Sequence, residues 1–176
     1  MQHEQEILDI VNENDDVIST LTREEIYEKK LKTFRTINAF LINEKKQLWI
    51  PVRSSQKLLW PGHLDASIGG HVQSGEKYDD AFKREVLEET NLKIDDFSWR
   101  DEGKLSPFQY QVSCFMKVYL IKTPQLDIDF NKSDFISAQW YYLNEIYEQI
   151  ASGTQVKPDL PPLLDFIKEP LSRFDI

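Results

Sequence analysis

Hydrophobic residues occur in short runs separated by polar turns over the first third of the chain. Residues 6–18 form two such runs around the turn-forming residues 12–16, which predicts a β-hairpin. Residues 36–42 and 47–52, on either side of the polar residues 43–46, predict a second hairpin. Further strands are expected at residues 66–68, 97–103, 112–121 and 136–142. The pattern therefore predicts a sheet of several short strands.

One stretch, residues 77–90, has a clear helical period. It contains no proline or glycine, and Tyr78, Phe82 and Val86 recur every four residues as one buried stripe. Asn91 suits a left-handed residue at the end of this helix.

Three weaker patterns predict further helices. Thr22 and Glu25 form a capping box, so a short helix should follow and end near Thr33. Residues 143–151 and 160–167 are also expected to be helical. Helices mixed with hairpins favour an α+β fold, as an α/β/α sandwich around a mixed sheet.

The composition is that of a chain that folds. Of its 176 residues, 40% are hydrophobic and 12% aromatic, enough for a core without disulfides. We expect a single domain, residues 1–176, whose N-terminal hairpin and short helix occupy residues 1–33. The single cysteine, Cys114, lies in an apolar stretch and is expected to be buried and inert.

The charge restricts the partners. Acidic residues outnumber basic ones by 30 to 21, which repels a nucleic-acid backbone, so no polymeric nucleic acid is expected as a partner. A small phosphorylated molecule can still bind if metal ions lie between carboxylates and phosphates. The chain has no signal-peptide pattern and no apolar run near the ~20 residues of a membrane span, so we expect a cytoplasmic protein without membrane contact. Its oligomeric state stays open, with a homodimer as one possible state.

Three glutamates at helical spacing are the main candidates for chemistry. Glu85, Glu88 and Glu89 are related as i, i+3 and i+4, so their carboxylates project from one helix face. Two like charges ~4 Å apart repel by about 1 kcal/mol in water and about 4 kcal/mol at an effective dielectric of about 20, so this face favours a cation. Carboxylates select hard cations such as Mg²⁺ or Mn²⁺. Taken alone, a solvated acidic helix face is the simpler interpretation.

The residues around these glutamates favour a metal site. Residues 70–92 resemble the Nudix box, which reads Gly, five residues, Glu, seven residues, then Arg-Glu-apolar-x-Glu-Glu-x-Gly-apolar. The matching residues are Gly70, Glu76, Arg84, Glu85, Val86, Glu88, Glu89 and Leu92. Asn91 replaces the usual glycine, and because both residues tolerate positive φ, the turn should survive.

The resemblance implies the Nudix fold and a Mg²⁺-dependent hydrolase, with Mn²⁺ as another usable metal. Its substrate would be a small molecule of the nucleoside-diphosphate-X type, cleaved at a diphosphate linkage. Glu85, Glu88 and Glu89 would be the catalytic metal ligands, joined by the carbonyl of Gly70, and Glu85 is a candidate general base.

Other residues are expected to support this site. The resemblance implies that Glu76 and Arg84 pair and brace the loop against the helix. In relatives an acid from a later loop often completes the metal site, and Asp134 is our candidate, with Asp127 and Asp129 as alternatives.

The substrate contacts are less defined by sequence. Arg53 and Lys57 precede the glycine-rich segment and are predicted to contact phosphate, and His71 is predicted to lie near the phosphate site. Trp60 and Tyr110 are candidates for stacking on a nucleobase, although aromatic residues more often belong to a core.

Two alternatives remain. Residues 6–19 of the predicted hairpin, together with residues 64–76, also resemble isopentenyl-diphosphate isomerases, in which a catalytic cysteine takes the place of Gly69 and an acidic pair aligns near residues 109–111, where this chain has no acid. His71 matches a metal-binding histidine of those enzymes. The second alternative is a non-catalytic sensor of a phosphorylated ligand, for which we would expect the helix glutamates to be lost. We therefore predict the hydrolase.

Overall fold

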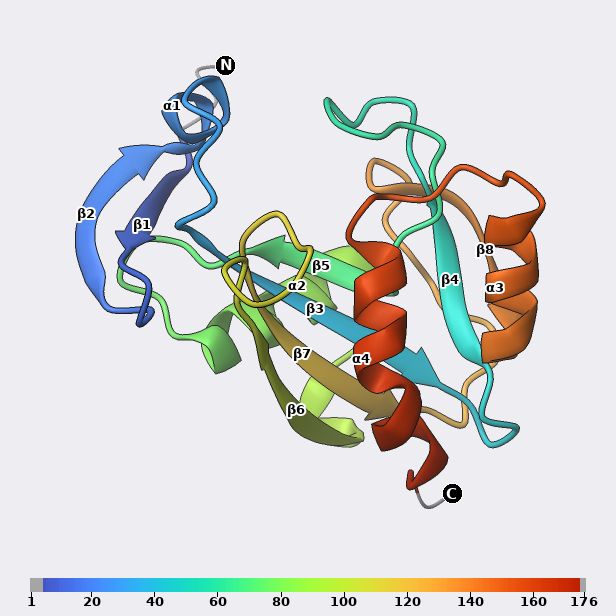
Figure 1. Ribbon diagram of the computed structural model, residues 1–176. Coiled ribbons are helices and arrows are strands. Elements are labelled where there is room, and N and C mark those ends of the chain that lie inside the picture. The colour runs from blue at the N-terminus through green and yellow to red at the C-terminus, as the bar shows by residue number, and fades with distance from the viewer. Residues whose placement is uncertain (1–4, 175–176) are drawn as a thin grey trace.

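The computed structural model describes residues 5–174; residues 1–4 of the predicted N-terminal unit and residues 175–176 lie outside the described part (Figure 1). The strands are β1 (Ile7–Val11), β2 (Val17–Thr22), β3 (Arg35–Ile42), β4 (Leu48–Arg53), β5 (Ile68–His71), β6 (Ser98–Leu105), β7 (Phe115–Lys122) and β8 (Phe135–Tyr141). The helices are α1 (Arg23–Glu28), α2 (Tyr78–Thr90), α3 (Leu143–Ala151) and α4 (Leu160–Ser172), with a 3₁₀ turn at Ile94–Asp96.

A mixed sheet of six strands forms the centre of the fold. Its order is β6-β7-β3-β4-β8, with β5 paired to β3 as well. Strands β3 and β7 are parallel, whereas the other pairs in this sheet are antiparallel. Strands β1 and β2 form a separate two-stranded sheet at one end of the molecule (Figure 1).

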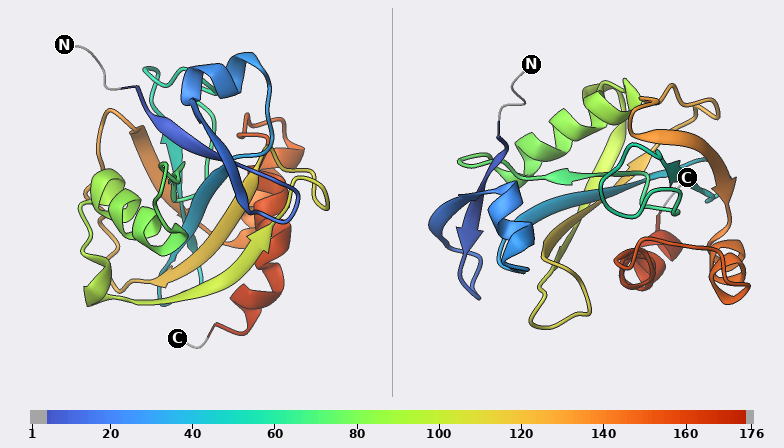
Figure 2. Two further views of the ribbon diagram at one scale, coloured as in Figure 1. Left: turned by 90° about the vertical axis from the view of Figure 1, so that its left-hand side faces the viewer. Right: turned by 90° about the horizontal axis from the view of Figure 1, so that it is seen from above.

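Helices cover both faces of the central sheet. Helix α2 lies over one face, and α3 and α4 lie over the other (Figure 2). Alternate residues of β3 face the two layers: Ile37 packs in the core on the α2 side, and Phe40 packs in the core on the α4 side. On the α2 side, Phe82 stacks on Tyr119 with ring centroids 4.0 Å apart. The predicted α+β sandwich is confirmed.

A buried serine, Ser67, links the backbones of β3 and β4. The Ser67 hydroxyl accepts a hydrogen bond from the Leu41 amide at 2.9 Å and donates one to the Trp49 carbonyl at 2.5 Å. It thereby satisfies backbone groups of both strands. Strand β5 then lies beside β3 at residues 68–71, so the prediction of a strand at 66–68 was wrong by two residues or more.

Three predicted boundaries also differ from the structure. Helix α1 ends at Glu28 and not near Thr33, because Lys30 has a φ of 52° and the Leu31 amide turns back to the carbonyl of Ile26. Strand β7 begins at residue 115 and not 112. Helix α4 continues to residue 172, beyond the predicted 167.

The N-terminal hairpin is fixed to the rest of the molecule by Asp15. This buried carboxylate binds Arg35 at 2.7 Å and accepts a hydrogen bond from the Tyr78 hydroxyl at 3.0 Å, and Lys104 forms a further ion pair with it. These three partners come from β3, α2 and β6, so one turn residue ties the hairpin to three elements. Among residues 5–174, no helix is long and apolar enough to cross a membrane.

Candidate functional site

A cavity of about 870 Å³ lies where α1, the start of β3, β5 and one face of α2 meet. Its carboxylate end is lined by Glu85, Glu88, Glu89 and Asp134. Its other end is lined by residues of α1 and of the segments around residues 113–116 and 157–159. A cavity of this size holds a small organic molecule.

Gly70 and Glu85 make the closest approach in the site. A Cβ atom on Gly70 would lie 1.9 Å from the carboxylate carbon of Glu85 and 2.0 Å from one of its oxygens. Only glycine therefore allows this carboxylate to lie against β5. Burial raises the pKa of Glu85 to about 7, in spite of the opposing effect of the Arg84 guanidinium 2.6 Å away.

Glu89 and Glu88 differ sharply in exposure. Glu89 is buried and accepts a hydrogen bond from the Gly69 amide at 3.0 Å. Its burial, and next the neighbouring Glu85, raise its pKa well above the usual range. The Glu88 side chain is 57% exposed, and its carboxylate lies 3.3 Å from Arg84.

Arg84 joins the helix to the preceding loop. Its guanidinium donates to both carboxylate oxygens of Glu76 at 2.9 Å and to the carbonyl of His71 at 2.9 Å. Glu76 also accepts the amide of Gln73 at 3.0 Å, which closes the loop on itself. A bidentate pair of this kind fixes orientation as well as distance.

The oxygen donors of this face fit a hard divalent cation. Within residues 5–174, no three acidic, histidine or cysteine side chains converge on one point, since Glu85 and Glu88 contact Arg84 and Glu89 contacts an amide. Two of the carboxylates, Glu85 and Glu89, are nevertheless buried in the cavity wall, and this burial raises the pKa of both. Carboxylates with a backbone carbonyl are the donors that Mg²⁺ and Mn²⁺ accept.

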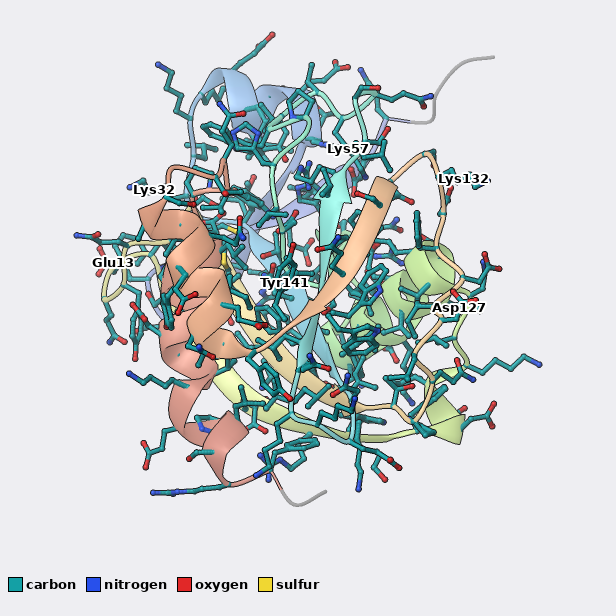
Figure 3. The ribbon with its side chains drawn as sticks, turned by 90° about the vertical axis from the view of Figure 1, so that its right-hand side faces the viewer. Glu13, Lys32, Lys57, Asp127, Lys132 and Tyr141 are labelled. Carbon is teal, nitrogen blue, oxygen red and sulfur yellow. The ribbon has the colours of Figure 1, made fainter. Side chains whose placement is uncertain are left out.

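Asp134 lines the same cavity, and Lys57 is its partner. The Lys57 ammonium lies 2.5 Å from the Asp134 carboxylate, and the Ser54 amide donates to the Asp134 carbonyl at 2.8 Å. Asp129 instead accepts a hydrogen bond from Asn91 beyond the end of α2. Figure 3 shows Lys57 at the same end of the sheet as Lys132, with Asp127 lower on that loop and away from Lys57. Of the three aspartates, Asp134 is the one that lines the cavity.

Arg53 lines the cavity with its guanidinium already engaged. It binds Asp65 at 2.6 Å and donates to the carbonyls of Leu59 and Trp60 at 2.9–3.2 Å, so it holds the loop that follows β4. Trp60 lines the cavity as well, whereas Tyr110 packs against the ring of Phe166 on α4.

His71 faces the N-terminal unit. Its Nε2 lies 2.9 Å from the Tyr27 hydroxyl, and its Nδ1 lies 3.3 Å from the Glu6 carboxylate. Burial lowers the pKa of His71, which favours the neutral ring. These contacts could not be predicted from local sequence patterns, because they join three segments that are far apart in the chain.

Several cavity residues were absent from the sequence-based prediction. They come from α1 and from the segments before β3, β7 and α4, and include Tyr27, Phe34, Ser113, Lys157 and Asp159. Local sequence patterns do not identify them, because long-range packing brings them to the cavity.

The N-terminal hairpin also supports the loop before α2. Asp9 is buried and accepts hydrogen bonds from the Ser74 hydroxyl at 2.7 Å and from the Gly75 amide at 3.1 Å. The Ser74 amide donates to the carbonyl of Ile7, so β1 holds this loop through backbone and side chain together.

We expect Asp9→Ala to destabilise the protein by about 1–3 kcal/mol, because it leaves two polar groups of the loop without their acceptor. Thermal unfolding would then shift down by roughly 3–10 °C for a chain of this length. Asp16→Ala, which removes an exposed carboxylate from the same hairpin, is the control and should have a much smaller effect. Equal melting temperatures for Asp9→Ala and the unaltered protein would contradict the bracing role.

Comparisons with known proteins identify the family of this chain. The family model described as NUDIX domain matches residues 32–164. An uncharacterized Nudix hydrolase of Nostoc sp. is 46% identical over 164 residues, which cover 93% of this chain and 96% of the relative. The crystal structure of DR0079 from Deinococcus radiodurans is 42% identical with a TM-score of 0.86, covering 91% of this chain and 98% of that one.

A more distant similarity concerns the isomerases. An isopentenyl-diphosphate Delta-isomerase of Rhizobium rhizogenes is 27% identical over 154 residues, which cover 78% of this chain and 70% of the relative. The family model, in contrast, matches more than half of the chain, and the Nostoc hydrolase is similar over nearly its whole length. The chain therefore belongs to the Nudix hydrolase family.

Proposed function

We propose that this protein is a Mg²⁺-dependent hydrolase that cleaves a diphosphate linkage in a small molecule of the nucleoside-diphosphate-X type, with Mn²⁺ as another usable metal. The observation that carries the proposal is the pair of buried carboxylates, Glu85 and Glu89, packed against the backbone of Gly69 and Gly70 in one wall of the cavity. Such a pair is costly without a cation.

The residues that would hold the metal are Glu85, Glu88, Glu89, the carbonyl of Gly70 and Asp134. A bound Mg²⁺ supplies neutralisation of the diphosphate oxygens and a lower pKa for a coordinated water.

The other roles in the proposed reaction are carried out by side chains of the protein. Glu85 is the candidate base that takes the proton of the attacking water at its carboxylate. Glu76 and Arg84 fix the loop before α2 to the helix, so that the Gly70 carbonyl and the Glu85 carboxylate stay close to each other. Lys57 lies beside Asp134, where its ammonium contacts a substrate phosphate.

Two alternatives have less support. An isomerase that moves protons on carbon uses a cysteine at the position of Gly69, and glycine offers no such group. A sensor without activity has no need for all three helix glutamates, and this chain retains Glu85, Glu88 and Glu89.

The proposal is tested by ³¹P NMR of the purified protein with Mg²⁺ and a mixed panel of nucleoside di- and triphosphates, nucleotide sugars, dinucleoside polyphosphates and isopentenyl diphosphate. We expect new phosphate or diphosphate signals that disappear when a chelator is added. Conversion of isopentenyl to dimethylallyl diphosphate without phosphate release would instead establish the isomerase. Tight ligand binding without turnover would establish the sensor.

A further inference from the structure

We propose that the inner pocket, the end of the cavity lined by Tyr27, Phe34, Ser113, Lys157 and Asp159, recognises a planar ring that carries a carbonyl oxygen, and that Lys157 is the specificity-determining residue. The proposed ligand is a nucleobase with a carbonyl group, such as uracil or hypoxanthine, which this pocket would bind in preference to adenine. This inference rests on the proposed function, since it assigns the part of the same substrate that lies beyond the phosphates.

Lys157 is held firmly at the base of this pocket. Its amide donates to the carbonyl of Leu64 at 2.8 Å, and the preceding residue, Val156, pairs with Leu64 as an isolated bridge. The side chain is 22% exposed, and Lys157 lines the cavity. The backbone anchors the flexible stem of Lys157, and the Asp65 carboxylate, 3.5 Å from Nζ, positions its ammonium group.

The Lys157 ammonium keeps hydrogen-bonding capacity for a ligand. Its Nζ lies 3.5 Å from one oxygen of Asp65, whose other oxygen already binds Arg53 at 2.6 Å. Burial opposes the charge of Lys157, but Asp65 and Asp159 outweigh it and raise its pKa, so the group stays protonated. An ammonium group carries three donors and no acceptor, and a long contact to one carboxylate leaves donors available.

Two aromatic rings and a fixed polar pair line the inner pocket. The rings of Tyr27 and Phe34 lie edge to face with centroids 6.3 Å apart, and Ser113 donates to both oxygens of Asp159 at 2.8 Å. Aromatic walls with a few fixed polar groups are typical of sites for planar ligands. Tyr27 belongs to α1, which precedes the residues matched by the family model.

The charge of Lys157 decides between ligand classes. A hydrocarbon chain such as an isoprenoid offers no acceptor, so its binding would desolvate the ammonium without compensation. A ring carbonyl is a strong acceptor for this donor. Adenine has no carbonyl, and it presents an amino group at the position where hypoxanthine has its carbonyl. The pocket should therefore discriminate IDP from ADP, two substrates of nearly equal size.

The experiment compares kcat/KM for UDP, IDP and ADP with Mg²⁺ in the unaltered protein, Lys157→Met and Lys157→Arg. We expect UDP or IDP to exceed ADP by about tenfold or more, Lys157→Met to reduce that ratio to within about threefold, and Lys157→Arg to retain most of it. The control is Lys168→Met, an exposed lysine of α4, which should leave the ratio unchanged. Asp65 keeps Arg53 as a partner in all three variants, and equal melting temperatures would show that the variants are folded.

Calorimetric titration with UMP, IMP and AMP in the absence of metal separates this inference from the proposed function. Tighter binding of UMP or IMP than of AMP that is lost in Lys157→Met supports the inner pocket, even if no nucleotide is hydrolysed. Three results would overturn the role of Lys157. They are equal kcat/KM values for ADP, UDP and IDP, an unchanged ratio of these values in Lys157→Met, and no binding of UMP, IMP or AMP.

Discussion

Replacing Glu88 with glutamine is expected to lower Mg²⁺-dependent turnover by on the order of 10²–10³-fold while leaving the fold intact, because one carboxylate ligand contributes several kcal/mol to catalysis by a bound metal. The carboxylate is 57% exposed and its contact with Arg84 is 3.3 Å long, so it contributes little to packing. We expect the melting temperature to change by less than about 2 °C. Steady-state kinetics and Mn²⁺ titration of the same preparation would measure both effects.

Asp80→Asn is the matched control for this variant. It removes one negative charge from an exposed position in the first turn of α2, away from the cavity, and should change turnover by less than about twofold. Unaltered turnover in Glu88→Gln would refute the assignment of Glu88 to the metal site. A large fall in melting temperature, seen only when metal is removed, would instead give the metal a structural role.

The α2 region could be predicted closely because its signals are local. In the predicted stripe of α2, Phe82 and Val86 are buried and Tyr78 is half-buried, and Asn91 adopts the left-handed conformation with a φ of 53° that was predicted for it. Helical geometry alone then places the glutamates on one face. Both hairpins were predicted for a similar reason, since turn residues and alternation are read within a few positions.

The remaining features depend on contacts between distant segments. The Ser67 hydroxyl bonds the backbones of β3 and β4, and no local pattern in the sequence indicates these two contacts. Arg53 was predicted to meet phosphate from its place in a loop, but its guanidinium is engaged by Asp65, 12 residues away. Lys157 reaches the cavity because its segment pairs with Leu64, more than 90 residues earlier. Sequence therefore predicted the carboxylate end of the cavity and missed the inner pocket.

Gly70→Ala is expected to abolish most activity and to lower stability by about 1–3 kcal/mol. The added Cβ would lie 1.9–2.5 Å from the carboxylate atoms of Glu85, closer than any such contact allows, so the Glu85 side chain or β5 must move. Movement of Glu85 removes a proposed metal ligand and separates it from Arg84. Activity with Mg²⁺ would measure the loss of turnover, Mn²⁺ titration the loss of the metal ligand, and thermal unfolding the loss of stability.

Gly69→Ala separates this effect from a general intolerance of side chains in β5. Its Cβ would meet the Asn38 Oδ1 atom at 3.2 Å, a tight contact but one with a side-chain end, and the backbone amide that serves Glu89 is retained. We expect a smaller loss of stability and preserved metal binding in this variant. Equal losses in the two variants would mean that the whole strand must be free of side chains. A fully active Gly70→Ala would mean that Glu85 works from a different position, and the proposed metal site would then have to be reassigned.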